Sequence, residues 1–211
     1  MTTHQFSDVI TTEEALRTVV GHPTPRAVEK SLLALDAHCR KFISRSPFVL
    51  VSTSDASGKA DVSPKGDKPG FVVVVDDHTL LVPDRPGNRR VDSLSNIIQN
   101  PNVGLLFLVP GIGEMMRVNG KARLVRDGAY LAQMAVNGKQ PLLAIAVDVQ
   151  EAFIHCAKAV IRSSIWKSET WTAPEDMPSI ARVIGDQVRS LGCTVEEYEQ
   201  QVKVAYTQGL Y

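Results

Sequence analysis

The strongest constraint on the fold is a two-residue alternation in "EMMRVNGKARLV", residues 114–125. Successive side chains of a β-strand point to opposite faces of a sheet. One face of this segment carries apolar side chains, namely Met116, Val118, Ala122 and Leu124. The other face carries polar and basic side chains, namely Arg117, Asn119, Lys121 and Arg123. The pattern predicts a strand with one buried face.

Several other segments have strand character. "FVLVSTSDASGKADVSP" predicts two strands joined by a tight turn at Ser57-Gly58, and "FVVVV" and "TLLVP" around residues 76–78 predict a second hairpin. The run from Asn102 to Val109 is apolar on both faces, which favours a central position in the sheet. "PLLAIAVDVQEAFIHC" predicts a long strand ending at Cys156. Six or seven short strands joined mostly by hairpins are typical of an antiparallel barrel.

Helical patterns flank these strands. Residues 11–46 are expected to be helical in two pieces, one starting at a Thr11–Glu14 capping box and one running from about Pro25 to Ser46. A short helix is expected over residues 127–136. Two more are expected near residues 180–191 and 194–206, the second starting at a Thr194–Glu197 capping box.

Composition limits the possible partners. The 211 residues are 44% apolar and 22% charged, with 23 basic and 23 acidic residues, so no net field favours nucleic acid or a membrane. The cysteines Cys39, Cys156 and Cys193 are widely spaced and odd in number, which argues against a disulfide framework. We find no leader sequence at the N-terminus and no apolar run of membrane-spanning length. These features predict a cytoplasmic protein.

An arginine cluster stands out in "VPDRPGNRRVDSLSNIIQNP", residues 82–101. Arg85, Arg89 and Arg90 surround the predicted start of a helix, where the positive end of the helix dipole disfavours cations. They could form a solvated surface compensated by Asp84 and Asp92. Alternatively, an anion could lie between the guanidinium groups and the helix N–H groups.

Two further segments could carry binding groups. In "HCAKAVIRSSIW", residues 155–166, Lys158 and Arg162 share a helix face, where they would either extend into water or share a phosphate. In "DVSPKGDKPG", residues 61–70, a turn at a strand end could present main-chain groups to a flat polar ring. Composition alone favours a plain hairpin connection there.

The remaining motifs exclude several kinds of site. There is no dinucleotide-binding G-x-G-x-x-G after a strand, no P-loop and no cysteine or histidine pair at zinc spacing. Cys156 with His38 or His155 could form a nucleophile–base pair, but a small buried thiol is the better interpretation of Cys156. Since no acid, base or nucleophile stands out, a bound cofactor would have to supply the chemistry.

The extended blocks resemble a known family. "FVLVSTSDASGKADVSPKGD", "PDRPGNRRVDSLSNIIQNPNVGLLFLVPG", "RVNGKA" and "HCAKAVIRSSIW" resemble an uncharacterised subfamily of the pyridoxamine 5′-phosphate oxidase-related, FMN-binding split-barrel flavoproteins. The resemblance covers residues 48–166. It implies an α+β, mainly β fold: a six-stranded antiparallel split β-barrel (48–166) with an N-terminal helical segment (1–47) and a C-terminal helical extension (167–211) in one structural domain.

The resemblance also implies a cofactor, FMN, at a homodimer interface. Residues in three places would hold it. Ser63, Pro64 and Lys65 would line the flavin ring, with Pro83, Asp84 and Arg85 bordering the same groove. Asn88, Arg89, Arg90 and Ser93 would hold the phosphate and ribityl chain. Lys158, Arg162 and Trp166 would come from the partner subunit, with Arg117 nearby.

The expected activity is an FMN-dependent oxidoreduction of an unassigned substrate, with NAD(P)H as a possible electron donor. The sequence lacks the pattern by which the true oxidases hold pyridoxal phosphate, so oxidation of that vitamer is not expected. One alternative is a flavin-binding or flavin-sequestering protein without turnover. Another is a split barrel that binds a deazaflavin or haem.

Overall fold

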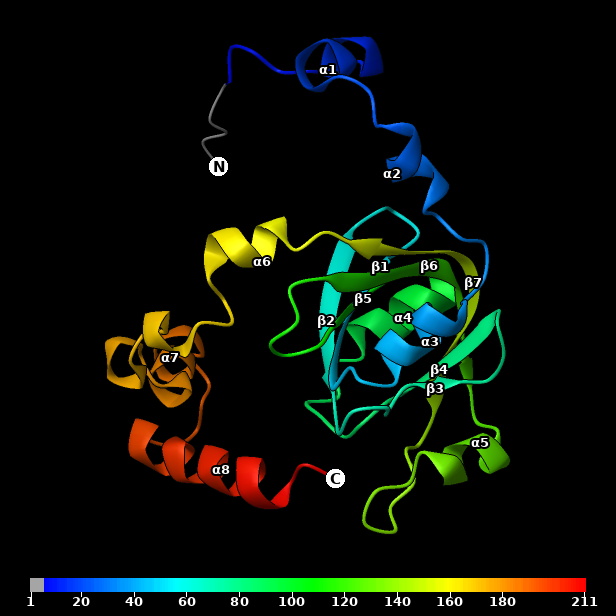
Figure 1. Ribbon diagram of the computed structural model, residues 1–211. Coiled ribbons are helices and arrows are strands. Elements are labelled where there is room, and N and C mark those ends of the chain that lie inside the picture. The colour runs from blue at the N-terminus through cyan, green and yellow to red at the C-terminus, as the bar shows by residue number, and fades with distance from the viewer. Residues whose placement is uncertain (1–5) are drawn as a thin grey trace. The chain divides into compact units, whose positions relative to one another are not determined.

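The structure is a computed structural model that describes residues 6–211, so the first five residues of the N-terminal segment lie outside it. The described chain divides into two compact units, one ending at Ser31 and one formed by residues 32–211 (Figure 1).

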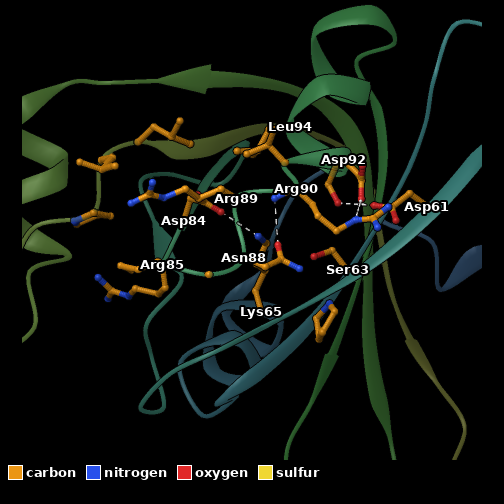
Figure 2. Close-up of a pocket in the computed structure, with 18 of the residues that line it drawn as sticks. Asp61, Ser63, Lys65, Asp84, Arg85, Asn88, Arg89, Arg90, Asp92 and Leu94 are labelled. Carbon is orange, nitrogen blue, oxygen red and sulfur yellow. Dashed lines mark hydrogen bonds and ion pairs between the residues drawn. The ribbon is translucent and has the colours of Figure 1, made fainter. Parts of the chain in front are cut away.

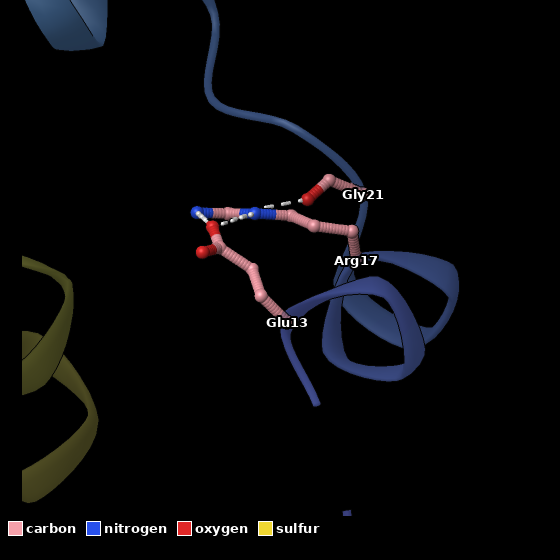
Figure 3. A network of polar contacts seen from close by, with 3 residues as sticks. All are labelled: Glu13, Arg17 and Gly21. Atoms are coloured by element: carbon pink, nitrogen blue, oxygen red, sulfur yellow. Dashed lines mark hydrogen bonds and ion pairs between the residues drawn. The ribbon is translucent and has the colours of Figure 1, made fainter. Parts of the chain in front are cut away.

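The first unit contains two short helices, α1 (Glu13–Val20) and α2 (Pro25–Glu29). The side-chain oxygen of Thr12 accepts a hydrogen bond from the Ala15 N–H and starts α1. Arg17 pairs with Glu13 one turn earlier and donates to the carbonyl oxygen of Gly21 at the end of the helix (Figure 3).

The start of α1 therefore differs from the prediction. The expected capping box at Thr11 and Glu14 is wrong, because Thr12 is the N-cap and the helix begins at Glu13. The sequence does not distinguish between the two consecutive threonines as caps. In the structure, Thr12 accepts the capping hydrogen bond from the N–H group of Ala15, three residues later.

The second unit is built on one seven-stranded antiparallel sheet. Its strands are β1 (Phe48–Ser54), β2 (Ala60–Gly66), β3 (Val73–Val74), β4 (Thr79–Pro83), β5 (Asn102–Leu108), β6 (Met115–Val125) and β7 (Ala144–His155). Their order in the sheet is β2-β1-β5-β6-β7-β4-β3. The predicted class, mainly β with flanking helices, is confirmed. The sheet has seven strands rather than six because the two-residue β3 pairs with β4 at one edge.

The predicted strands are confirmed, although the one expected from Phe71 is only Val73–Val74 and the last ends at His155 rather than Cys156. Both expected hairpins form, β1–β2 and β3–β4, and β5 lies in the interior of the sheet between β1 and β6. In β6, Met116 and Val118 are buried while their neighbours Arg117 and Asn119 are half-buried. The pairing of β6 with β7 shifts at Gly120, where a Cβ atom would collide with the backbone of Asp148.

The core lies on the inner face of this sheet. Helix α4 (Asp92–Gln99) packs on β1, β2 and β6, and α3 (Ala37–Ile43) packs on β6 (Figure 1). Side chains from alternating strand positions meet Ile43 and Ile97 of these helices, among them the fully buried Phe107. Burial of each such side chain favours folding by about 1.5–3 kcal/mol. This packing fixes the start of α4 next to β2.

The single helix expected from about Pro25 to Ser46 is wrong. Leu32 exchanges both of its backbone hydrogen bonds with Ala152, and the Leu35 N–H donates to the carbonyl oxygen of Asp77. Asp36 then caps a new helix, α3, by accepting from the Cys39 N–H. Backbone bonds to the sheet thus replace the helical bonds that the sequence pattern suggested.

The other helices agree with prediction within a few residues. They are α5 (Gly128–Gln133), α6 (Lys158–Ser163), α7 (Ile180–Gln187) and α8 (Val195–Gln208), with 3₁₀ turns at Ser168–Thr170 and Pro174–Asp176. The Thr194–Glu197 capping box is confirmed at the start of α8. Among the helices of residues 6–211, none has the length and apolar character needed to cross a bilayer.

Candidate functional site

The main pocket of the second unit lies where β2 meets the loop from β4 to α4. Its volume is about 850 Å³, within the range of roughly 300–1,000 Å³ that is typical of small-molecule sites. Three segments and one distant residue line it: residues 61–65 of β2, residues 84–94 of the loop and α4, residues 139–143 before β7, and Tyr211 (Figure 2).

One wall is the inner face of β2. Asp61, Ser63 and Lys65 alternate with the exposed Val62 and Pro64, so the polar side chains of this strand share the half-buried face. Within residues 6–211, β2 is an edge strand that pairs with β1 alone, which is why proline is tolerated there and why one row of main-chain groups stays outside the sheet. Residues 61–66 of the segment 61–70 thus form an edge strand, and residues 67–70 lie in its connection to β3 at the other edge of the sheet, so the expected plain hairpin connection is wrong.

Polar contacts join β2 to the opposite wall. The hydroxyl group of the buried Ser93 donates to Asp61 at 2.5 Å, and the Lys65 Nζ lies 2.9 Å from the Asp84 Oδ1. Beyond the end of β2, the Arg85 Nε lies 2.8 Å from the Asp67 Oδ2. These contacts fix the loop against the strand.

The carboxylates only partly match the expected compensation of the arginines. Asp92 does pair with Arg90, at 2.7 Å between Oδ2 and Nε. Asp84, in contrast, pairs with Lys65, and the partner of Arg85 is Asp67. The side chains of Asp84 and Arg85 therefore point to different partners, although the two residues are adjacent in sequence. Asp84 points to Lys65 on β2, and Arg85 points to Asp67 beyond the end of β2.

Arg89 differs from Lys65, Arg85 and Arg90, which are the cations of the pocket that pair with carboxylates. Within residues 6–211 it forms no ion pair with a carboxylate, although it lines the pocket and is exposed (Figure 2). Its backbone is left-handed, with φ of 61°, and the Asn88 Oδ1 accepts from the next N–H, that of Arg90. Left-handed backbone is costly for a residue with a Cβ atom, so the loop holds Arg89 in an uncommon conformation.

The start of α4 faces the same space. Its N-cap residue, Val91, is also left-handed, with φ of 56°, and its side chain accepts no hydrogen bond from the first turn. The first N–H groups of a helix carry partial positive charge and seek acceptors. Val91, Asp92, Ser93 and Leu94 all line the pocket. An uncapped helix start next to an unpaired guanidinium group is an arrangement that binds anions.

Asp67 is the most deeply buried charge near the pocket, with 1% of its side chain exposed. Burial alone would raise its pKa, but hydrogen bonds from the Tyr211 hydroxyl and the Lys68 N–H, together with the charge of Arg85, outweigh burial and lower the pKa. The same hydrogen bond raises the pKa of Tyr211. Asp67 is thus held ionised and Tyr211 is held neutral.

Of the predicted site residues, nine line the pocket: Ser63, Pro64, Lys65, Asp84, Arg85, Asn88, Arg89, Arg90 and Ser93. Pro83 is buried at the end of β4, directly before the lining segment. The remaining four, Arg117, Lys158, Arg162 and Trp166, do not line this pocket.

Those four residues lie on β6 and around α6. Arg117 lies over the Phe153 ring at 4.9 Å, and the Trp166 Nε1 donates to the carbonyl oxygen of Ile112 at 2.8 Å. Lys158 and Arg162 are exposed. Their role in a cofactor site would require a second chain and stays a prediction.

Sequence analysis missed the wall formed by residues 139–143 and Tyr211. No local pattern marks either of them, because their place depends on how the chain returns to the pocket from elsewhere in the fold. Asp61 and Asp67 could have been predicted as members of the site, because they follow the same two-residue period as Ser63 and Lys65. That period predicts one polar face.

The cysteines do not form a reactive centre with the pocket. Cys39 is buried, and burial raises the pKa of its thiol to about 11. Cys156 is exposed, so its interpretation as a buried thiol is wrong: β7 ends at His155, and the next residue lies beyond the sheet. Among residues 6–211, no group of three or more histidine, cysteine or acidic side chains could hold a metal ion.

Comparison with known proteins gives a family match. A family model described as pyridoxamine 5′-phosphate oxidase matches residues 35–156, more than half of the chain. No curated protein matches the sequence.

Three similar solved structures illustrate the range of related proteins. HupZ from Group A Streptococcus is 21% identical, with a TM-score of 0.45, covering 56% of this chain and 92% of that chain. A putative pyridoxamine 5′-phosphate oxidase from Lactobacillus delbrueckii is 21% identical, with a TM-score of 0.44, covering 58% and 95%. An FMN-binding protein from Syntrophomonas wolfei is 10% identical, with a TM-score of 0.42, covering 67% and 95%. Similarities of this size say nothing about what this chain binds.

Proposed function

This chain belongs to the pyridoxamine 5′-phosphate oxidase family, and from that membership and the geometry of the pocket we propose that it is an FMN-binding flavoprotein. The observation that carries the proposal is the uncapped start of α4 beside Arg89, the arginine of the pocket lining that has no carboxylate partner in residues 6–211. Both features favour a phosphate group, and the pocket has room for a cofactor around it.

The phosphate would lie between the Arg89 guanidinium group and the first N–H groups of α4. A phosphate monoester carries nearly two negative charges, which oppose the like-charge repulsion between arginine and helix dipole. Asn88 and Ser93 line the same end of the pocket. This arrangement explains why basic residues are found at a helix start.

The flavin ring would lie along β2. The main-chain groups of β2 that point away from β1 are not used by the sheet, and those among Ser63, Pro64 and Lys65 that do so could bond the polar edge of the ring. Asp84 balances the charge of Lys65 at 2.9 Å and orients its ammonium group within the pocket wall. When bound, the flavin supplies the hydride chemistry, and the residues of the chain bind and orient it.

A homodimer is part of the proposal. Val62 and Leu142, both on the pocket lining, expose 58% and 82% of their surfaces, which a partner subunit would cover. The partner would also bring Lys158, Arg162 and Trp166 to the ring, with Arg117 nearby. We infer a cytoplasmic oxidoreductase of unassigned substrate, with NAD(P)H as a possible donor.

Two other functions differ from this proposal in ways that can be measured. A flavin-sequestering protein is favoured by the absence, among the described lining residues, of a histidine or cysteine that could move a proton at the ring. The described lining likewise offers no histidine or cysteine ligand to a haem iron, although it contains Tyr211, and tyrosine is another known iron ligand. A deazaflavin would use the same phosphate end as FMN.

The test is the visible absorption spectrum of the freshly purified protein, with the released ligand identified by mass. Flavin bands and the mass of FMN would support the proposal, and the mass of a deazaflavin or of haem would replace it. A colourless protein that fails to take up added FMN would refute it. Turnover of NAD(P)H by the holoprotein then separates an oxidoreductase from a sequestering protein.

A further inference from the structure

Tyr211 makes three contacts with charged side chains in and beside the pocket. Its hydroxyl group donates to the Asp67 Oδ1 at 2.8 Å. Its ring lies under the Arg85 guanidinium group, 5.7 Å from the ring centroid. Its main-chain oxygen accepts from the Lys139 Nζ at 2.8 Å. The hydroxyl group, the aromatic face and an oxygen acceptor of one residue are each held by a separate charged side chain.

Each of these three charged groups matches a different part of a tyrosine-like molecule. Asp67 is a buried, ionised acceptor that fits a hydroxyl donor, and the planar Arg85 fits an aromatic face. Lys139 fits an anionic oxygen. Asp67 follows β2 and Arg85 follows β4, and an ion pair of 2.8 Å that does not involve Tyr211 joins them.

The surroundings provide apolar room beside these charged groups. Asp67 and Arg85 also line a second cavity of about 200 Å³, whose walls include Phe71, Met134 and Val136. Tyr211 borders the larger pocket but not this second cavity. Withdrawal of Tyr211 would therefore expose Asp67 and Arg85 between two open spaces.

We propose that Asp67, Arg85 and Lys139 form a binding subsite for small phenolic carboxylates, and that Tyr211 occupies this subsite as an internal competitor. The ligand class follows from the occupant. Tyrosine has an aromatic ring, a para hydroxyl group, and a carbonyl oxygen whose carbon is separated from the ring by two carbons. As a substrate site beside a flavin, the inference rests on the proposed function. As a binding site, it depends only on these contacts.

The probe that copies the occupant is 3-(4-hydroxyphenyl)propanoate, which has the carbon skeleton of tyrosine from the ring to the carbonyl group. The matched probe is 3-phenylpropanoate, which lacks the hydroxyl group. Binding of both would be measured by calorimetry on the full chain as purified, on Tyr211→Phe and on Tyr211→Ala. Tyr206→Ala, which removes an exposed tyrosine of α8, serves as the control.

We expect affinity for the phenolic probe to rise from the parent through Tyr211→Phe to Tyr211→Ala, by about tenfold or more overall, with the Tyr206→Ala variant like the parent. In Tyr211→Ala the phenolic probe should bind at least about tenfold more tightly than 3-phenylpropanoate, the effect of one hydrogen bond to a charged group. Adding Lys139→Met, a change at an exposed side chain, should reduce that affinity by a similar factor.

Equal probe affinity in the parent and in Tyr211→Ala, or no preference for the hydroxyl group, would overturn the inference. FMN uptake by the same preparations separates the two proposals. Retained FMN with no probe binding refutes the subsite alone. Probe binding to Tyr211→Ala in a chain that takes up no flavin supports the subsite and refutes the flavin function.

Discussion

Replacing Arg89 tests the phosphate end of the pocket most directly. Arg89 has no carboxylate partner in the described chain, so Arg89→Ala breaks no internal ion pair and its cost should fall on the ligand. A hydrogen bond to a charged group contributes about 1.5–3 kcal/mol, which corresponds to a loss of roughly 10- to 150-fold in FMN affinity. The assay is equilibrium titration of the apoprotein, followed by quenching of flavin fluorescence.

Riboflavin provides the internal control because it is FMN without the phosphate group. Arg89→Ala should leave riboflavin affinity unchanged, and Arg89→Lys, which keeps the charge but loses the planar fork, should fall between the parent and Arg89→Ala. Arg182→Ala removes the same charge from α7, outside the pocket lining, and should bind FMN like the parent. If Arg89→Ala weakened FMN and riboflavin equally, Arg89 would not contact the phosphate and the reasoning would be refuted.

Three other predictions concern stability and reactivity. Gly120→Ala should lower the free energy of unfolding by about 1–3 kcal/mol in urea titration, because its Cβ atom would collide with the backbone of β7, whereas Gly128→Ala, which meets no atom, should not. The lowered pKa of Asp67 means that its ionised form stabilises the fold above its unfolded pKa and that this contribution is lost as the pH falls through its folded pKa. Asp67→Asn should therefore flatten the loss of stability below about pH 5, and an unchanged acid profile would contradict this account. At pH 8, iodoacetamide should modify the exposed Cys156 but spare Cys39, whose pKa of about 11 and burial both suppress reaction, and mass mapping would detect the opposite order.

The local parts of the fold could be predicted because their signals are local. The alternation in β6 and the turn residues between β1 and β2 are complete within a dozen residues, and both are confirmed. The helix expected from about Pro25 to Ser46 failed for the opposite reason. Its bonding partners, including Ala152 at Leu32, lie far away in sequence, and no helical period reports them.

The candidate site, like the fold, was predictable in its local parts and not in its long-range contacts. The arginine loop predicted a local anion site, which stays a prediction, and the structure shows that α4 begins beside this loop without a side-chain cap. The pairing of charges was not predictable, because Asp84 is adjacent to Arg85 in sequence yet bonds Lys65 of another strand. Tyr211 lies 144 residues from its partner Asp67, a distance over which sequence patterns carry no information.

The tight turn between β1 and β2 does not line the pocket, but it affects which side chains of β2 do. The Asp55 carboxylate accepts from the Ser57 and Lys59 N–H groups and fixes the length of this turn, and the turn length sets which residues of β2 face inward. If the ladder rather than the loop took up one residue inserted there, the pairing of β2 with β1 would shift by one residue. Asp61, Ser63 and Lys65 would then turn to the exposed face of β2, and Val62 and Pro64 would turn to its half-buried face. A change in an exposed loop, usually a tolerant location, would in this chain exchange a polar wall for an apolar one in a single step.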